Sequence, residues 1–88
     1  MARRDNVAPR HAIITGAASG LGQAFAIRLA REGYHLALAD FDPVAAQTTA
    51  QLVEQAGGSC QIESLDVRQY DQWEAMLARL RAEWPRLD

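Results

Sequence analysis

The feature that most constrains the fold of this chain is a glycine-rich segment, TGAASGLG, at residues 15–22. A short apolar, β-branched run at residues 11–15 leads into it, which is typical of a strand buried in a parallel sheet. After it, apolar residues recur four apart, which indicates a helix over residues 21–32 that ends at Gly33. Glycines at such a junction let the backbone turn sharply and let the helix pack closely on the strand. The residues that set the helical spacing are Leu21, Phe25 and Leu29.

A second strand and a second helix are predicted next. Residues 34–40 form another short apolar run that ends in an acid, and residues 43–56 are expected to form a helix. Asp42 suits the N-cap because its side chain can accept from free backbone N–H groups, and Pro43 suits the first turn because it has no N–H to leave unpaired. The buried stripe expected for this helix comprises Ala45, Thr49, Leu52, Val53 and Ala56.

A third pair completes the pattern. Gly57 and Gly58 favour the left-handed exit of a helix, and a strand is expected over residues 61–66. Residues 71–74, DQWE, match a capping box, and the helix that it begins should end at Pro85. Its apolar positions at helical spacing are Trp73, Leu77, Leu80 and Trp84.

This alternation predicts an α/β fold, the N-terminal β-α-β-α-β-α part of a Rossmann-type, doubly wound parallel sheet. The third strand should lie outside the second, and the second outside the first. We expect residues 1–10 to be a flexible tail and residues 11–88 to be the N-terminal part of a dinucleotide-binding domain that stops before its fourth strand. The strand at residues 11–15 would then be an open, apolar edge, which natural domains avoid.

Composition excludes several classes of function. With 49% hydrophobic and 23% charged residues the chain is ordinary for a globular protein, and its net charge of −2 disfavours nucleic acid and anionic membranes as partners. There is no lysine, so a mechanism that needs a lysine amine is excluded. Cys60 is the single cysteine, which fits a reducing cytoplasm and a packed thiol. No metal site is predicted, and His11 and His35 are interpreted as structural.

The glycine-rich segment and a later acid together predict a dinucleotide site. Backbone N–H groups and the positive end of the following helix stabilise phosphate charge. Asp40 closes the second strand, 20 positions after Gly20, where a carboxylate can accept hydrogen bonds from the adenosine ribose hydroxyls. It would repel a 2′-phosphate, and the nearby positions Ser19 and Phe41 are not basic. NAD is therefore favoured over NADP.

The Gly-x-x-x-Gly-x-Gly spacing at Gly16, Gly20 and Gly22, preceded by Thr15, resembles the short-chain dehydrogenase/reductase family. The resemblance covers nearly the whole chain and continues through REG at residues 31–33, the strand-end acid, the paired glycines and LDV at residues 65–67. The resemblance assigns the cofactor phosphates to the glycine segment, the adenosine ribose to the end of the second strand, and the adenine to the end of the third. The implied binding residues are Gly16, Ser19, Gly20, Leu21, Gly22, Asp40, Phe41, Asp66 and Val67.

The sequence also departs from the family. The Asn-Asn-Ala-Gly stretch, the catalytic serine and the Tyr-x-x-x-Lys pair are absent, and Tyr34 and Tyr70 lie too early in the chain to replace the tyrosine. No catalytic residue is therefore assigned. The resemblance implies an oxidoreductase that moves hydride between nicotinamide and a carbonyl or alcohol substrate, a homo-oligomer at full length, whereas the 88-residue chain alone should be inactive.

Two other interpretations stay open. The chain could be a complete, non-catalytic nucleotide-binding or interaction module whose open strand edge pairs with another chain. It could also be part of an S-adenosylmethionine-dependent methyltransferase, which uses a glycine loop and a strand-end acid on a related sheet. Ser19 and the spacing of Gly20 and Gly22 argue against the methyltransferase.

Overall fold

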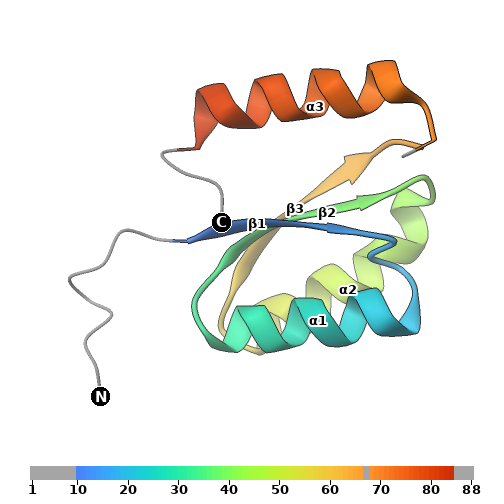
Figure 1. Ribbon diagram of the computed structural model, residues 1–88. Helices are drawn as coiled ribbons and strands as arrows, with labels where there is room; N and C mark the ends of the chain where they lie inside the picture. The colour runs from blue at the N-terminus through green and yellow to red at the C-terminus, as the bar shows by residue number, and fades with distance from the viewer. Residues whose placement is uncertain (1–9, 67, 85–88) are drawn as a thin grey trace.

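A computed structural model describes residues 10–66 and 68–84 of the chain. Strands and helices alternate along it as β1-α1-β2-α2-β3-α3 (Figure 1). The strands make one parallel sheet in the order β1-β2-β3, which confirms the predicted fold class and strand order. The predicted tail lies outside the described residues except for Arg10, whose carbonyl accepts from the backbone N–H of His35 at 2.8 Å. The elements are β1 His11–Thr15, α1 Gly20–Arg31, β2 His35–Asp40, α2 Pro43–Gln55, β3 Ser59–Ser64 and α3 Tyr70–Glu83.

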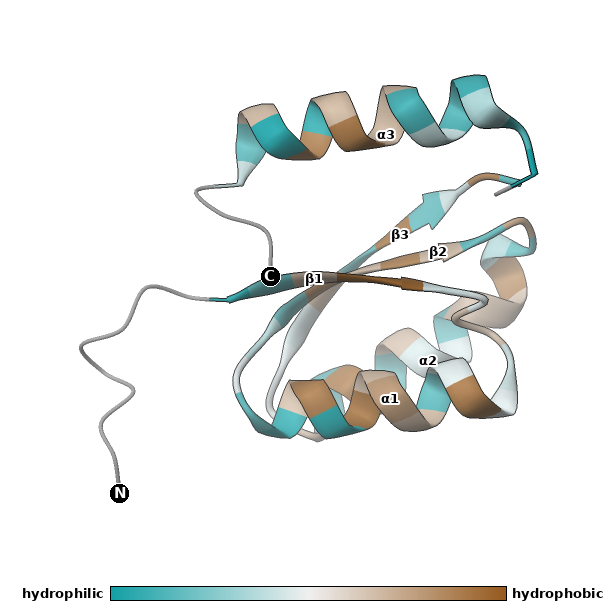
Figure 2. Cartoon of the chain, viewed as in Figure 1, coloured by the Kyte–Doolittle hydropathy of each residue, from teal (hydrophilic) through white to brown (hydrophobic). Residues whose placement is uncertain are grey.

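Helices α1 and α2 cover one face of the sheet and α3 covers the other (Figure 1). Successive side chains of β2 point to opposite faces of the sheet. Leu36 and Leu38 pack against α1 and α2, whereas Ala37 and Ala39 pack against α3. Apolar colouring is strong along most of β1 and on parts of α1, whereas the end of β3 is hydrophilic (Figure 2). Because the strands are parallel, all three carboxyl ends meet at one edge of the sheet, which is where this fold places ligands.

Small residues, not large ones, line the buried side of α1. The helix buries Gly22, Ala26 and Ala30, while Leu21 is 70% exposed and Phe25 57% exposed. The four-residue spacing predicts the helix correctly, and the structure shows that its buried face is formed by other, smaller residues. Close packing explains the difference: a Cβ added at Gly58 would lie 2.6 Å from the Cβ of Ala30, so larger side chains have no room there.

Helix α2 begins as the sequence predicts. The Asp42 carboxylate accepts from the backbone N–H of Ala45 at 3.1 Å, and a proline occupies the first position. The helix buries Ala46, Thr49 and Val53. The predicted stripe is thus right at Thr49 and Val53 and wrong at Ala45, which is exposed, whereas Leu52 and Ala56 are half-buried. Gly57 adopts φ = +97°, so the left-handed exit is confirmed.

Two predictions at the third unit need correction. Strand β3 starts at Ser59, two residues earlier than expected, because it pairs with β2 directly after the close approach at Gly58. Helix α3 starts at Tyr70 with Gln69 as N-cap, and no side chain caps it, so the predicted capping box at residues 71–74 is wrong. Those residues lie inside the helix, where Asp71 instead places its negative charge in the first turn.

The face under α3 carries polar contacts as well as apolar ones. His35 Nδ1 lies 2.7 Å from the Ser59 hydroxyl oxygen, and His35 Nε2 lies 2.9 Å from Gln61 Oε1, so the ring is hydrogen-bonded at both nitrogens. Gln61 in turn donates to Glu63, and Arg79 of α3 pairs with the same carboxylate. Around them pack the apolar residues Met76, Leu80 and Trp84, with Trp73 and Leu77 half-buried. In the described part of the chain, no helix has the length and apolar character needed to cross a membrane.

Candidate functional site

Ser19 organises the glycine-rich loop between β1 and α1. Its hydroxyl donates to the carbonyl of Gly16 at 2.7 Å and accepts from the backbone N–H of Gly22 at 3.1 Å. Its own N–H donates to the same Gly16 carbonyl at 3.0 Å. Gly16 adopts φ = +61°, a conformation that side-chain-bearing residues rarely take. Ser19 is thus the N-cap of α1 and closes the loop into a fixed turn.

Gly22 and Gly20 differ in how much space surrounds them. A Cβ at Gly22 would lie 3.0 Å from the carbonyl carbon of Gly16 and 3.2 Å from the Cα of Ala17, so a side chain there would push the loop off the helix. A Cβ at Gly20 would meet nothing within 4 Å. Gly20 and Leu21 are both exposed, and the first turn of α1 holds no acidic residue. The positive end of α1 is therefore open to an anion from solvent.

Helix α2 contacts the glycine-rich loop and helps to fix its position. The hydroxyl of Thr49, which is fully buried, donates to the carbonyl of Ala17 at 2.8 Å. Gln23 of α1 donates to the same hydroxyl at 3.3 Å. The backbone N–H of Ala17 reaches the carbonyl of Ala39 on β2 at 3.4 Å. The position of the loop is therefore fixed by contacts to two neighbouring elements.

Asp40, at the end of β2, is hydrogen-bonded to two backbone groups. One carboxylate oxygen accepts from the N–H of Ala18 in the glycine loop at 2.9 Å, and the other accepts from the N–H of Asp42 at 2.9 Å. A carboxylate has about four lone-pair sites, so both oxygens keep acceptor capacity for further donors. The acid thus links the glycine loop to the end of β2 while it remains half-buried and accessible.

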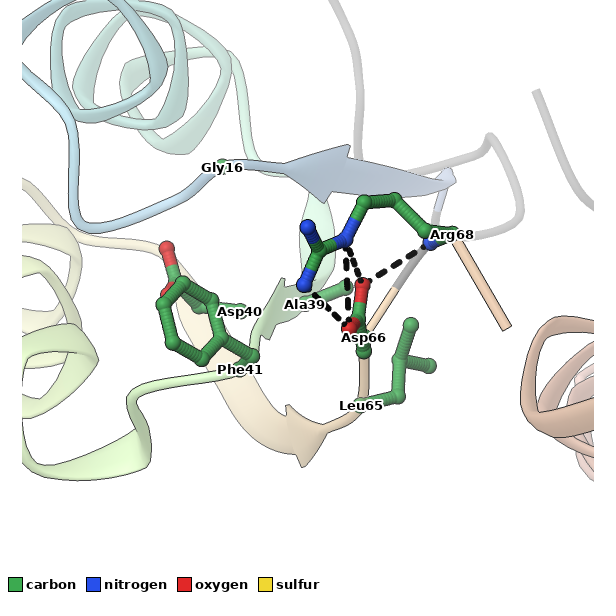
Figure 3. A pocket seen from close by; sticks show the side chains of 7 residues that line it. All are labelled: Gly16, Ala39, Asp40, Phe41, Leu65, Asp66 and Arg68. Carbon is green, nitrogen blue, oxygen red and sulfur yellow. Dashed lines mark hydrogen bonds and ion pairs between the residues drawn. The ribbon is translucent and has the colours of Figure 1, made fainter.

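A cavity of ≈ 310 Å³ opens at the carboxyl ends of the strands, a volume typical of small-ligand pockets. It brings together four of the residues predicted for cofactor binding: Gly16, Asp40, Phe41 and Asp66 (Figure 3). Ser19, Gly20, Leu21 and Gly22 lie in the adjoining loop and first turn of α1. Val67 is outside the described residues. Ala39, Leu65 and Arg68 complete the lining.

Arg68 is the site residue that the sequence analysis missed. Its Nε and Nη2 atoms donate to the two oxygens of Asp66 at 3.0 and 2.8 Å, and its backbone N–H donates to Asp66 Oδ1 at 3.0 Å. These bonds stabilise the carboxylate and lower the pKa of Asp66 from 3.8 to about 2. The only signal in the sequence that could have indicated this pair is the basic residue two positions after Asp66.

Other titratable residues lie away from this cavity. Cys60 packs against the core under α2, and burial, with Glu54 nearby, raises the pKa of its thiol, which makes it a poor nucleophile. His11 and His35 face each other across β1 and β2 with ring centroids 5.5 Å apart, and Trp84 packs on both. Within residues 10–66 and 68–84, no three His, Cys, Asp or Glu side chains gather as a metal would require.

Comparisons with known proteins agree with this geometry. Residues 10–88 match the family model described as short chain dehydrogenase. The chain is 39% identical over 77 residues to a sorbitol dehydrogenase from Cereibacter sphaeroides, a match that covers 88% of this chain and 29% of that enzyme. The chain therefore belongs to the short-chain dehydrogenase family, an oxidoreductase family, and the methyltransferase interpretation has no support.

Two solved structures show what relatives bind. A short-chain dehydrogenase from Mycobacterium paratuberculosis bound to NAD aligns with a TM-score of 0.79 and 32% identity over 90% of this chain and 34% of that one. A metagenomic short-chain oxidoreductase in complex with NADP aligns with a TM-score of 0.85 and 26% identity over 90% and 35%. The chain spans less than a third of the length of the curated relatives it matches.

Proposed function

We propose that this chain is the NAD-binding, N-terminal segment of an oxidoreductase that transfers hydride between nicotinamide and a carbonyl or alcohol carbon. The observation that carries this proposal is the bond between Asp40 and the N–H of Ala18, because it joins the ribose-binding acid and the phosphate-binding loop into one preformed unit. In this assignment, residues 11–88 are the first part of a dinucleotide-binding domain of a longer protein.

The pyrophosphate, the adenosine ribose and the adenine of the cofactor each have chemically suitable partners in this site. The open N-terminus of α1 and the loop from Gly16 to Gly22 supply donors and positive potential for the pyrophosphate. The unused lone pairs of Asp40 can accept from the ribose hydroxyls. The cavity beside it, with Phe41 and Leu65 as apolar walls and Asp66 as acceptor, suits the adenine. Val67 completes the adenine site in the proposal.

NAD is the cofactor that this arrangement favours. A 2′-phosphate would bring negative charge against the Asp40 carboxylate. Arg68 is the basic residue of the cavity, but both its bonded nitrogens are directed at Asp66 and not at the ribose position beside Asp40 (Figure 3). In the unbound chain, no cationic side chain is thus held against the ribose position among the described residues that line the cavity.

Catalysis requires more than this segment. NAD supplies the hydride chemistry when bound, and the protein must add a proton donor beside the reacting carbon. Here Tyr34 and Tyr70 lie outside the cavity, and the sequence has no lysine to accompany a tyrosine. We expect the 88-residue chain to bind cofactor without turnover, and the full-length enzyme to be a cytoplasmic homo-oligomer acting on a small carbonyl or alcohol substrate.

Cofactor titration tests this function. NADH and NADPH are titrated into the 88-residue chain, and nicotinamide fluorescence gives the two Kd values. We expect NADH to bind at least tenfold more tightly, because the 2′-phosphate meets Asp40. Equal affinities would remove the role assigned to Asp40, and no binding of either would refute the proposal in favour of an interaction module.

The native size of the protein tests the assignment to a longer enzyme. An antibody raised against residues 42–58, an exposed helix and its exit turn, would detect the protein as its source cell produces it. A mass several times 9.7 kDa is expected. A mass of 9.7 kDa would instead support a non-catalytic module whose β1 edge pairs with another chain.

A further inference from the structure

The guanidinium of Arg68 stands in the cavity that the cofactor is proposed to enter. It lies between the end of β1 at Gly16 and the carboxylate of Asp66, with the apolar wall of Leu65 nearby (Figure 3). Its Nε bonds to Asp66 Oδ1 at 3.0 Å and to Oδ2 at 3.3 Å, and its Nη2 bonds to Oδ2 at 2.8 Å. The carboxylate oxygens that would receive an adenine amino group therefore already hold an arginine.

We propose that Arg68 is a gate for the adenosine end of the cofactor: its guanidinium covers Asp66 in the unbound protein and is displaced when adenine enters the cavity. This inference rests on the proposed function. In binding, the side-chain bonds from Arg68 to Asp66 break, and an adenine N–H donor takes their place on the carboxylate.

The gate can open because its side chain is exposed. The Arg68 side chain is 82% accessible, against 24% for Asp66, so solvent can take over the guanidinium at little cost. Exposed ion pairs of this kind contribute little net stability. The backbone N–H of Arg68 also bonds to Asp66 Oδ1, at 3.0 Å, and this bond does not depend on where the side chain points. Asp66 therefore keeps its position when the guanidinium leaves.

Asp40, the neighbouring acid of the cavity, is not covered by a movable side chain. Asp40 is bonded to the N–H groups of Ala18 and Asp42, which are fixed parts of the scaffold and leave the outer lone pairs of the carboxylate open. The ribose side of the cavity is thus preformed, whereas the adenine side must first be cleared. Arg68 competes with adenine for the Asp66 carboxylate. The observed affinity for any ligand that carries adenine should therefore be reduced in proportion to the fraction of molecules in which Arg68 leaves Asp66 uncovered.

The Arg68→Ala variant of the whole 88-residue chain tests the gate. We expect its Kd for NADH, measured by nicotinamide fluorescence, and its Kd for AMP, measured by calorimetry, to fall about two- to fivefold, the range that an exposed ion pair allows. Inorganic pyrophosphate, which lacks adenine, should not bind more tightly. The matched control is Arg81→Ala, which removes the same charge from an exposed position on α3, outside the cavity.

Each outcome decides the matter. Unchanged or weaker binding of NADH and AMP by Arg68→Ala, with wild-type binding intact, would overturn the gate and leave the proposed function standing. Absence of NADH binding in wild type and variant alike would overturn both. Arg68→Gln, which keeps a polar side chain and removes the charge, should tighten adenine binding in the same direction and guards against a folding defect in the alanine variant.

Discussion

Asp40 ends β2 and Asp66 lies two residues beyond the end of β3, and the two carboxylates are held in different ways. Asp40 after β2 is bonded to the backbone N–H groups of Ala18 and Asp42. Asp66 after β3 is bonded to one backbone N–H and to the exposed side chain of Arg68. The first acid is built into the scaffold and the second is covered by a movable group. Two acids that follow neighbouring strands can thus supply one preformed half and one switchable half of the same proposed ligand site.

The difference follows from what lies opposite each acid. Asp40 faces the glycine loop, whose close packing at Gly22 brings the backbone N–H of Ala18 within reach of the carboxylate. Asp66 lies two residues beyond the end of β3, and among the described residues the hydrogen bonds to its carboxylate come from Arg68, whose exposed side chain covers it. Substitutions in the glycine loop and at Asp40 should therefore have larger effects than substitution of Arg68 beside Asp66.

The largest effect is expected from Gly22→Ala. The added methyl group would overlap the carbonyl of Gly16, so the loop must move off α1 and carry Ala18 away from Asp40. Overpacking of this kind costs about 1–3 kcal/mol, which urea denaturation can measure, and NADH binding should be lost.

Gly20→Ala is the matched control for that variant. No atom lies within 4 Å of its added methyl group, and alanine has the higher helix propensity, so stability should be unchanged or slightly higher. If both alanine variants unfolded at the same urea concentration, the close packing assigned to Gly22 would be wrong.

A smaller loss is expected at Asp40. Asp40→Ala leaves two backbone N–H groups without their acceptor and should cost about 1–2 kcal/mol, while Asp40→Asn keeps one acceptor oxygen and should cost about half as much. Both variants lose the charge that repels a 2′-phosphate, so the ratio of NADPH to NADH Kd should fall towards one. A ratio that stays at the wild-type value in Asp40→Asn would assign cofactor choice to another residue.

The smallest effect concerns the titration of Asp66. Because Arg68 lowers the pKa of Asp66 from 3.8 to about 2, the pair stabilises the folded chain above about pH 4, and this contribution is lost as the pH falls towards 2. In Arg68→Ala the pKa should return towards 3.8, which a carboxyl-carbon NMR titration would show. An unchanged pKa would mean that the backbone bond alone holds the carboxylate ionised.

Local patterns predicted the elements, the glycine-rich turn and the acid that ends β2, and the family resemblance added Phe41 and Asp66 to the candidate site. The strand-to-helix glycines, the Asp42 cap and the acid ending β2 each depend on residues close in sequence, and the structure places Gly16, Asp40, Phe41 and Asp66 around one cavity. The bond from the N–H of Ala18 to Asp40 could not be anticipated in the same way, because it spans 22 residues and depends on how β1 and β2 pair.

Other features depended on packing or on turns that the sequence pattern does not reveal. The spacing of Leu21 and Phe25 indicates a helix, but the fully buried positions of α1 are Gly22, Ala26 and Ala30. The capping box failed because the turn at Gln69 begins α3 earlier than the side-chain pattern indicates. Arg68 was missed because an exposed arginine after a strand has many possible partners, and only the fold selects Asp66.

The most direct test of the proposed NAD site is an amide NMR titration of the uniformly ¹⁵N-labelled chain with NADH. We expect the resonances of residues 16–22, Asp40, Phe41 and Asp66 to shift together with one Kd, and NADPH at the same concentration to cause much smaller shifts. Shifts confined to α3 or to the amino ends of the strands, or equal shifts with both cofactors, would contradict the proposed site.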